Sequence, residues 1–260
     1  MIKLIVSDLD GTLLDANKEV STREFEALHL SRTQGIAFAL ASGRMRSEMN
    51  KIITQIDQNC ICISQNGAFI HSSDGQLLQS TYFEPSLARQ AYTMTSSPTI
   101  VRLICSGEAN YISQLTNASD AIQARMFEPF RILHHAEEAI EHELPVCKLS
   151  YFGDIQELLT IKRNLELHYG DQLTQFISDI DCLDIMPKGI SKGSALLYML
   201  DILNITVDEV ACIGDSFNDI SMFEVTPHSY AMRHSHPDVK TFARHIVANV
   251  AEAIEHIIAQ

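Results

Sequence analysis

The sequence predicts an α/β protein in which a parallel sheet is interrupted by an inserted α+β domain. Over residues 1–64, apolar runs and amphipathic stretches alternate as strand, helix, strand, helix, strand, which predicts right-handed crossovers. The same alternation returns near the end of the chain, whereas the middle has paired strands between its helices. We therefore expect one domain built from residues 1–82 and 187–260, and a second domain at 83–186.

The two ends of the chain supply the parallel sheet. The expected strands follow the apolar runs at Ile2–Val6, Ile36–Leu40, Cys60–Ser64, Val210–Ile213, Ser229–Met232 and His245–Ala248. Helices are expected at Ser21–Thr33, Met45–Ile56 and Ser191–Leu203, and at the end of the chain. Ser21 and Glu24 have the spacing of a capping box. Asp74-Gly75 lies between Ala68–His71 and Leu77–Thr81, which predicts a hairpin at the edge of the sheet.

The middle of the chain alternates differently. Helices are expected at Pro85–Thr95, Glu137–Glu143 and Ile155–His168. Strands are expected at Thr99–Cys105, Ala109–Ser113, Val146–Phe152, Phe176–Ser178 and Cys182–Ile185. Residues 114–134 have the weakest pattern, and no element is predicted there.

Composition and charge narrow the function classes. Apolar residues make up 46% of the chain and charged residues 20%, as in soluble globular proteins. The formal net charge of -14 argues against nucleic acid and anionic membranes as partners. The sequence has neither a signal-peptide pattern nor an apolar run long enough for a transmembrane helix. Six scattered cysteines without a CxxC motif favour buried, reduced thiols in the cytoplasm. A monomer or a homodimer is expected.

Two aspartates follow the first strand directly. Asp8 and Asp10 are two residues apart, so in an extended segment both side chains face the same cavity. Two carboxylates this close repel each other unless a cation or a proton intervenes, and Mg2+ prefers such oxygen ligands. A solvated turn and a calcium loop are the alternatives for this pair. The calcium loop is rejected, because Leu13 stands where that loop requires glycine and a strand pattern precedes it where a helix should.

Three more polar clusters lie where strands end or a helix starts: Ser42, Lys192, and Asp215 with Asn218 and Asp219. With Asp8-Leu9-Asp10-Gly11-Thr12, they resemble, in this order, the four motifs of the haloacid dehalogenase superfamily of phosphotransferases. The Ser-Gly-Arg at 42–44, the Asn-Gly-Ala at 66–68 and the position of the insertion resemble the Cof-type phosphatases with a type IIB cap. The resemblance implies a Rossmann-like core with an inserted α+β cap domain.

The resemblance also implies a role for each motif. Asp8 is the expected nucleophile and Asp10 the expected general acid and base. The expected cofactor is Mg2+, bound by Asp8, Asp215 and the backbone carbonyl of Asp10. The expected phosphate contacts are Ser42, Lys192, Asn218 and backbone N–H groups of the first loop at Leu9. Asp219 is expected to orient Lys192 or the water shell of the metal.

Substrate contacts are less defined by the sequence. Arg44 and Asn66 match family positions, with structural roles as the alternative, and Lys148 is the expected contact from the cap. Arg233 follows Ala231-Met232 where the family usually has glycine shortly afterwards, which puts the conformation of this loop in doubt. The pairs His134-His135 and His234-x-His236 have no helical partner or nearby acidic ligand in the sequence, so no metal role is expected for them.

The expected activity is Mg2+-dependent hydrolysis of small phosphorylated metabolites through an aspartyl-phosphate. Sugar phosphates rank first as substrates, followed by pyridoxal phosphate and flavin mononucleotide. A dehalogenase would not need Asp10. A phosphomutase of the same superfamily and a non-catalytic sensor of a phosphorylated metabolite remain as alternatives; an intact nucleophile argues against the sensor.

Overall fold

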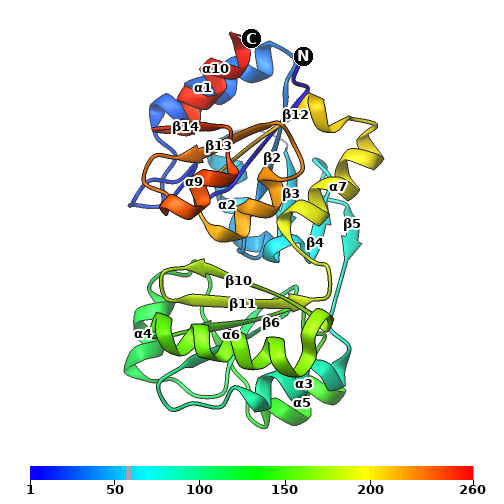
Figure 1. Ribbon diagram of the computed structural model, residues 1–260, viewed down its shortest axis with the longest axis vertical. Coiled ribbons are helices and arrows are strands. Elements are labelled where there is room, and N and C mark those ends of the chain that lie inside the picture. Colours follow the sequence, from blue (N-terminus) through cyan, green and yellow to red (C-terminus); the bar gives the residue numbers. More distant parts are fainter. Residues whose placement is uncertain (57–59, 260) are drawn as a thin grey trace. The chain divides into compact units, whose positions relative to one another are not determined.

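A computed structural model describes residues 1–56 and 60–259 of the chain (Figure 1). The chain forms two compact units, one from Met1–Ser80 and Ser191–Gln260 and the other from Thr81–Ile190. The second crossing between units lies after the expected boundary at 186/187. The reason is that strand β11 (Cys182–Pro187) runs through Pro187 and a turn at Lys188–Ile190 follows it before the first unit resumes.

The first unit is built on a mainly parallel sheet. Among the described residues its strand order is β14-β13-β12-β1-β2-β3-β4-β5. The strands are β1 (Leu4–Ser7), β2 (Ala37–Ala41), β3 (Ile61–Ser64), β4 (Phe69–His71), β5 (Leu77–Ser80), β12 (Val210–Gly214), β13 (His228–Met232) and β14 (His245–Val247). Pairing is parallel from β14 to β3, and β4 and β5 add antiparallel strands at one edge. The predicted hairpin at this edge is therefore confirmed.

Helices cover both faces of this sheet (Figure 1). They are α1 (Thr22–Thr33), α2 (Arg46–Gln55), α7 (Lys192–Leu203), α8 (Ile220–Phe223), α9 (Pro237–Phe242) and α10 (Val250–Ile258). Apolar residues of α7, α8 and α9 share one buried cluster with Leu4 and Val6 of β1. Helices α1 and α10 lie side by side on the other face.

The start of α1 differs from its prediction in one bond. The Ser21 hydroxyl accepts from the Glu24 N–H at 3.2 Å, as an N-cap should. The Glu24 carboxylate does not complete a capping box with Ser21; it accepts from the Val250 N–H at the start of α10. Glu24 thus ties together two helices from opposite ends of the chain.

The second unit is a mixed sheet with helices packed on one face. Its strand order among the described residues is β10-β11-β9-β6-β7-β8, with β7–β8 parallel and the other pairs antiparallel. The elements are α3 (Pro85–Met94), β6 (Val101–Cys105), β7 (Asn110–Ile112), α4 (Asn117–Gln123), β8 (Arg131–Ile132), α5 (Ala136–His142), β9 (Lys148–Phe152), α6 (Ile155–Tyr169), β10 (Leu173–Asp179) and β11. Alternate residues of β6, β9 and β11 point into one apolar core with α3, α5 and α6.

Two expectations about the whole chain can be compared with this fold. All six cysteines are buried and free, which confirms the prediction of unpaired thiols. In the part of the chain that the structure describes, no helix combines the length and apolar character needed to cross a membrane.

Candidate active site

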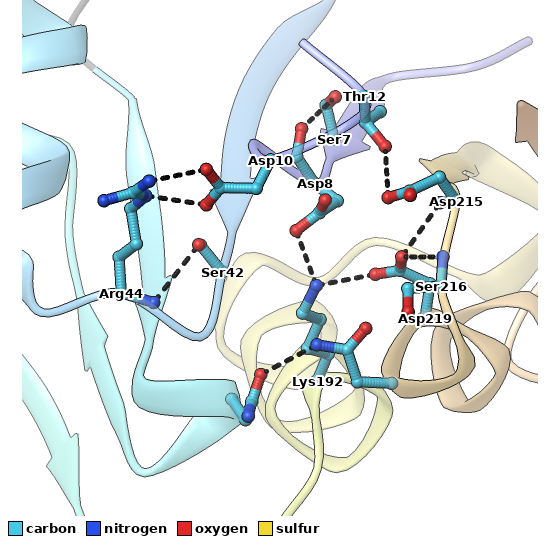
Figure 2. Close-up of polar contacts among 12 residues, drawn as sticks. Ser7, Asp8, Asp10, Thr12, Ser42, Arg44, Lys192, Asp215, Ser216 and Asp219 are labelled. Atoms are coloured by element: carbon cyan, nitrogen blue, oxygen red, sulfur yellow. Dashed lines mark hydrogen bonds and ion pairs between the residues drawn. The ribbon is translucent and has the colours of Figure 1, made fainter. Parts of the chain in front are cut away.

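The strand order brings the sequence motifs to one edge of the first sheet. Strand β1 pairs in parallel with β2 on one side and with β12 on the other. Asp8, Ser42 and Asp215 each follow the end of one of these three strands, so they meet at the same edge. The carboxyl ends of neighbouring parallel strands are where open α/β sheets bind ligands. Figure 2 shows the resulting group of polar side chains.

Lys192 lies between two carboxylates, one directly after β1 and the other in the segment after β12 (Figure 2). Its Nζ donates to Asp8 Oδ1 at 2.6 Å and to Asp219 Oδ1 at 2.7 Å. All three side chains are buried, and Lys192 is only 1% exposed. Lys192 is the first residue of α7, so the N-cap at Ser191 fixes the backbone from which its side chain extends. The pKa of Lys192 is raised because these carboxylates outweigh the opposing effect of burial.

Close backbone approaches hold Asp215 and Asp219 in place. The Thr12 hydroxyl donates to Asp215 Oδ1 at 3.1 Å, and a Cβ on Gly11 would stand 2.6 Å from Asp215 Oδ2. Asp219 Oδ2 accepts from the backbone N–H groups of Asp215 and Ser216, each at 3.0 Å. A Cβ on Gly214 would meet the Asp219 side chain at 2.4 Å. Both glycines are therefore required by the packing of these carboxylates.

The negative charge of the carboxylates in this cluster exceeds the positive charge of Lys192. Oxygens of Asp8, Asp215 and Asp219 all lie within 4.8 Å of one another. Burial raises the pKa of Asp8 well above its usual range, although Lys192 opposes the shift. Burial, and next the charge of Asp219, raises the pKa of Asp215 to about 7. Three carboxylates and one ammonium group have a net negative charge that a divalent cation would balance. Mg2+ suits the site because it prefers hard oxygen donors.

Asp8 and Asp215 are better placed than Asp219 to bind that cation. Both oxygens of Asp219 already accept hydrogen bonds, one from Lys192 and the other from the backbone. Asp219 therefore supports the site by fixing Lys192 and the loop after β12. Such partners that orient ligands commonly accompany metal sites.

Asp10 lies at the mouth of the cluster, where its side chain is 48% exposed. Both of its oxygens accept from Arg44, from Nε and Nη2, each at 2.6 Å (Figure 2). The Arg44 side chain is only 9% exposed, and its Nη1 is 3.6 Å from the buried Glu48 carboxylate. This two-pronged pairing orients Asp10 and gives Arg44 a contact within the site.

The remaining predicted phosphate contacts lie in the same unit. Ser42 and Leu9 are buried, and the Ser42 Oγ accepts from the Arg44 N–H at 3.2 Å. Asn218 is 7% exposed and donates from Nδ2 to Asn66 Oδ1 at 3.1 Å. Asn66 itself is fully buried.

Lys148, the predicted contact from the inserted domain, lies on β9 of the second unit. It is buried, and its Nζ is 3.9 Å from Asp184 Oδ1 on the neighbouring strand. Asp184 also accepts from the Ser150 hydroxyl at 2.5 Å. These three residues form a polar cluster on the sheet face opposite the apolar core, because they alternate with the core residues along β9 and β11.

Sequence reasoning missed several contacts, among them those of Thr12 and His234. Thr12, noted only as part of the first motif, bonds to Asp215, more than two hundred positions away. The expectation that His234 has no acidic neighbour is wrong: His234 Nε2 is 3.8 Å from Asp215 Oδ2. The loop after β13 starts at the same sheet edge as the loop after β12, which brings His234 there. Both contacts depend on which strands become neighbours in the sheet.

The chain is similar to known proteins over most of its length. Residues 5–258 match the family of haloacid dehalogenase-like hydrolases. An HMP-PP phosphatase of Citrobacter koseri is 26% identical over 92% of this chain and 87% of its own length. A 5-amino-6-(5-phospho-D-ribitylamino)uracil phosphatase of Bacillus subtilis is 28% identical over 92% of this chain and 90% of its own length.

Solved structures have the same fold. A haloacid dehalogenase-like hydrolase of B. subtilis superposes with a TM-score of 0.89 at 24% identity, covering 98% of this chain and all of the other. One from Bacteroides thetaiotaomicron has a TM-score of 0.82 at 28% identity, covering 99% of this chain and all of the other. The family match spans nearly the whole sequence. The chain therefore belongs to the haloacid dehalogenase-like hydrolase family, in its Cof-type branch.

Proposed function

We propose that this chain is a phosphatase that hydrolyses small phosphorylated metabolites through an aspartyl-phosphate on Asp8. The single observation that carries the proposal is the buried group in which Lys192 bridges Asp8 and Asp219 beside Asp215. A protein that only binds a phosphate group needs positively charged side chains for it. It has no need of a buried carboxylate such as Asp8 beside them, because that carboxylate would repel the phosphate. The named relatives are phosphatases, which supports the same reading.

In the first step an oxygen of Asp8 attacks phosphorus, and the bond from phosphorus to the leaving oxygen breaks. Lys192 balances charge on the attacking carboxylate and the phosphoryl oxygens. Asp10 gives its proton to the leaving oxygen. Because both Asp10 oxygens accept from Arg44, the Asp10 carboxylate has to turn away from Arg44 and take up a proton from water before it can do so.

In the second step a water molecule attacks phosphorus and the bond to Asp8 breaks. Asp10, now a carboxylate, takes the proton of that water. Asp8, Asp215 and the Asp10 backbone carbonyl would hold Mg2+, which supplies the positive charge that lets one anion attack another. Ser42, Asn218 and the Leu9 N–H are proposed to bind phosphoryl oxygens.

The substrate class is proposed from chemistry and relatives together. Hexose phosphates, pyridoxal phosphate and flavin mononucleotide are the first candidates. The substrates in the relatives' names, HMP-PP and a phosphorylated ribitylaminouracil, join the panel. We propose that the second unit selects among them, with Lys148 as a substrate contact beside Asp184.

Release of p-nitrophenolate from p-nitrophenyl phosphate tests the function. The assay compares wild type with Asp8→Asn, in Mg2+ and in EDTA. We expect turnover that needs Mg2+ and is lost in the variant, because asparagine keeps the shape but not the nucleophile. Turnover that persists in purified Asp8→Asn would refute the role of Asp8. Failure of wild type on both this ester and the metabolite panel would refute the phosphatase.

A further inference from the structure

The loop after β3 adopts a backbone conformation that few side chains accept. Gln65, Asn66 and Gly67 have successive φ values of 48°, 54° and 105°. Left-handed backbone is unfavourable for most residues, but Asn and Gly tolerate it. All three residues are buried, with Asn66 at 0% exposed. A strained loop inside a protein persists only when its surroundings enforce it.

This loop is joined to the loop that carries Ser42. The Asn66 N–H donates to the Ser42 carbonyl and the Gln65 N–H to the Arg44 carbonyl, each at 2.9 Å. A Cβ on Gly43 would stand 3.2 Å from Asn66 Oδ1, so the amide of Asn66 rests on the Gly43 backbone. The left-handed turn points the N–H groups of Gln65 and Asn66 at the loop that carries Ser42.

The same amide fixes Asn218. Asn66 Oδ1 accepts from Asn218 Nδ2 at 3.1 Å, across 152 positions of sequence. This bond determines which way the Asn218 amide points, and it leaves Asn218 Oδ1 buried with no hydrogen-bond partner among the described residues. A buried acceptor without a partner is unfavourable. The Asn218 amide therefore keeps this orientation because Asn66 holds it there. Asn218 precedes Asp219, the partner of Lys192.

Gly67 extends the contact to the start of α7. A Cβ at Gly67 would stand 2.2 Å from the Ser191 carbonyl and 3.2 Å from the Ala195 Cβ. Ser191 caps the helix whose first residue is Lys192. The three residues of the loop therefore touch each segment predicted to contact phosphate outside the first motif: the Ser42 loop, Asn218 and the start of α7.

We infer that Asn66 is a positioning residue for phosphate binding. Its side chain sets the pose of the Asn218 amide, and its left-handed backbone holds the Ser42 loop. This role differs from the predicted substrate contact, because the Asn66 Oδ1 is engaged by Asn218 and its N–H by Ser42. This inference rests on the proposed function, because a change in kcat/KM can be measured only if the protein is a phosphatase.

The variant Asn66→Gly tests the side chain alone, because glycine keeps the left-handed backbone and its N–H. Asn204→Gly is the matched control: Asn204 has φ 53° and is exposed at the end of α7. We expect Asn66→Gly to weaken the affinity for inorganic phosphate, measured by calorimetry in Mg2+, about tenfold and to lower kcat/KM by a similar factor. Asn204→Gly should change neither value.

A double-mutant cycle shows whether Asn66 acts through Asn218. In that case Asn66→Gly adds less than about twofold to the loss already caused by Asn218→Ala. Full additivity of the two losses, or wild-type phosphate affinity in Asn66→Gly, overturns the inference. If Asn66→Gly fails to fold, Asn66→Ala, which also removes the acceptor, enters the cycle in its place.

The two readouts separate this inference from the proposed function. Loss of phosphate affinity in Asn66→Gly supports positioning even if wild type hydrolyses no ester. If wild type hydrolyses esters and Asn66→Gly has the same phosphate affinity and kcat/KM, the proposed function stands and the role of Asn66 is refuted.

Discussion

Lys192 is the residue on which the site's electrostatics depend. Its ammonium group is buried and bonds to Asp8 and Asp219, so it compensates charge that burial would otherwise make costly. Among the described residues, no hydrogen bond takes its third N–H. That donor is available for a phosphoryl oxygen.

Replacing Lys192 by Met should remove transition-state stabilisation. We expect kcat/KM for p-nitrophenyl phosphate to fall about 100- to 1000-fold, the usual cost of losing one such donor. Lys188→Met is the control, since Lys188 is exposed and its ion pair is with exposed Asp171. Thermal unfolding of both variants separates lost catalysis from lost folding. A Lys192→Met enzyme within tenfold of wild type would contradict the role of Lys192.

The protonation of Asp215 makes metal affinity depend on pH. Burial first, and Asp219 next, raises the pKa of Asp215 to about 7 in the metal-free protein. Mg2+ binds the carboxylate form, so protons compete below this pH and cease to compete above it. Calorimetry should show Mg2+ affinity falling as pH decreases through about 7, by up to about tenfold per unit. An affinity that is flat between pH 6 and 8 would show that Asp215 is not a ligand.

At the scale of elements, the start of α7 depends on close packing against α8. A Cβ on Gly193 would stand 2.0 Å from the Ser221 carbonyl, and the Gly193 N–H donates to the Ser221 hydroxyl at 3.0 Å. This contact sets the distance between Lys192 and the segment that holds Asp219. Glycine is needed there for proximity, not for backbone freedom.

Gly193→Ala should therefore behave opposite to an ordinary helix substitution. Glycine to alanine in a helix normally stabilises by about 0.5–1 kcal/mol. Here we expect destabilisation of about 1–3 kcal/mol, as in overpacked cores. Urea unfolding measures the change, with Asp201→Ala on the exposed part of the same helix as control. An unchanged or raised stability would mean that α7 and α8 are not packed this closely.

Sequence periodicity predicted the elements better than their contacts. Helix α6 (Ile155–Tyr169) was expected at Ile155–His168, because a long amphipathic helix has a clear period. Residues 114–134 gave no prediction because α4 has seven residues and β8 two, too few to show a period. The aspartates and Lys192 could be named from motifs. The bonds from Arg44 to Asp10 and from Asn66 to Asn218 could not, because they depend on which strands become neighbours.

At the scale of the whole molecule, the proposed catalysis and the proposed substrate selection belong to different units. Asp8, Lys192 and Asp215 belong to the unit formed by both ends of the chain, and Lys148 to the inserted one. The inserted unit is continuous in sequence and has its own apolar core. A unit with its own core is a candidate for independent folding.

The division can be tested by separating the units. Residues 81–190 alone should give a cooperative unfolding transition and no phosphatase activity. Residues 1–80 joined to 191–260 by a short Gly-Ser linker should still hydrolyse p-nitrophenyl phosphate, while losing the wild-type ranking among metabolites. Retention of that ranking would show that selectivity does not come from the inserted unit.

The central claim is that Asp8 carries the phosphoryl group, and Asp10→Asn with p-nitrophenyl phosphate tests it most directly. Nitrophenolate leaves without a proton, so the first step proceeds, whereas the second lacks its base. We predict a burst of one nitrophenolate per protein in Mg2+, followed by slow turnover. Borohydride reduction of the quenched protein should then convert Asp8 to homoserine, located by peptide mass spectrometry. A burst with the reduced residue elsewhere, or steady turnover with Asp8 unmodified, would contradict the account.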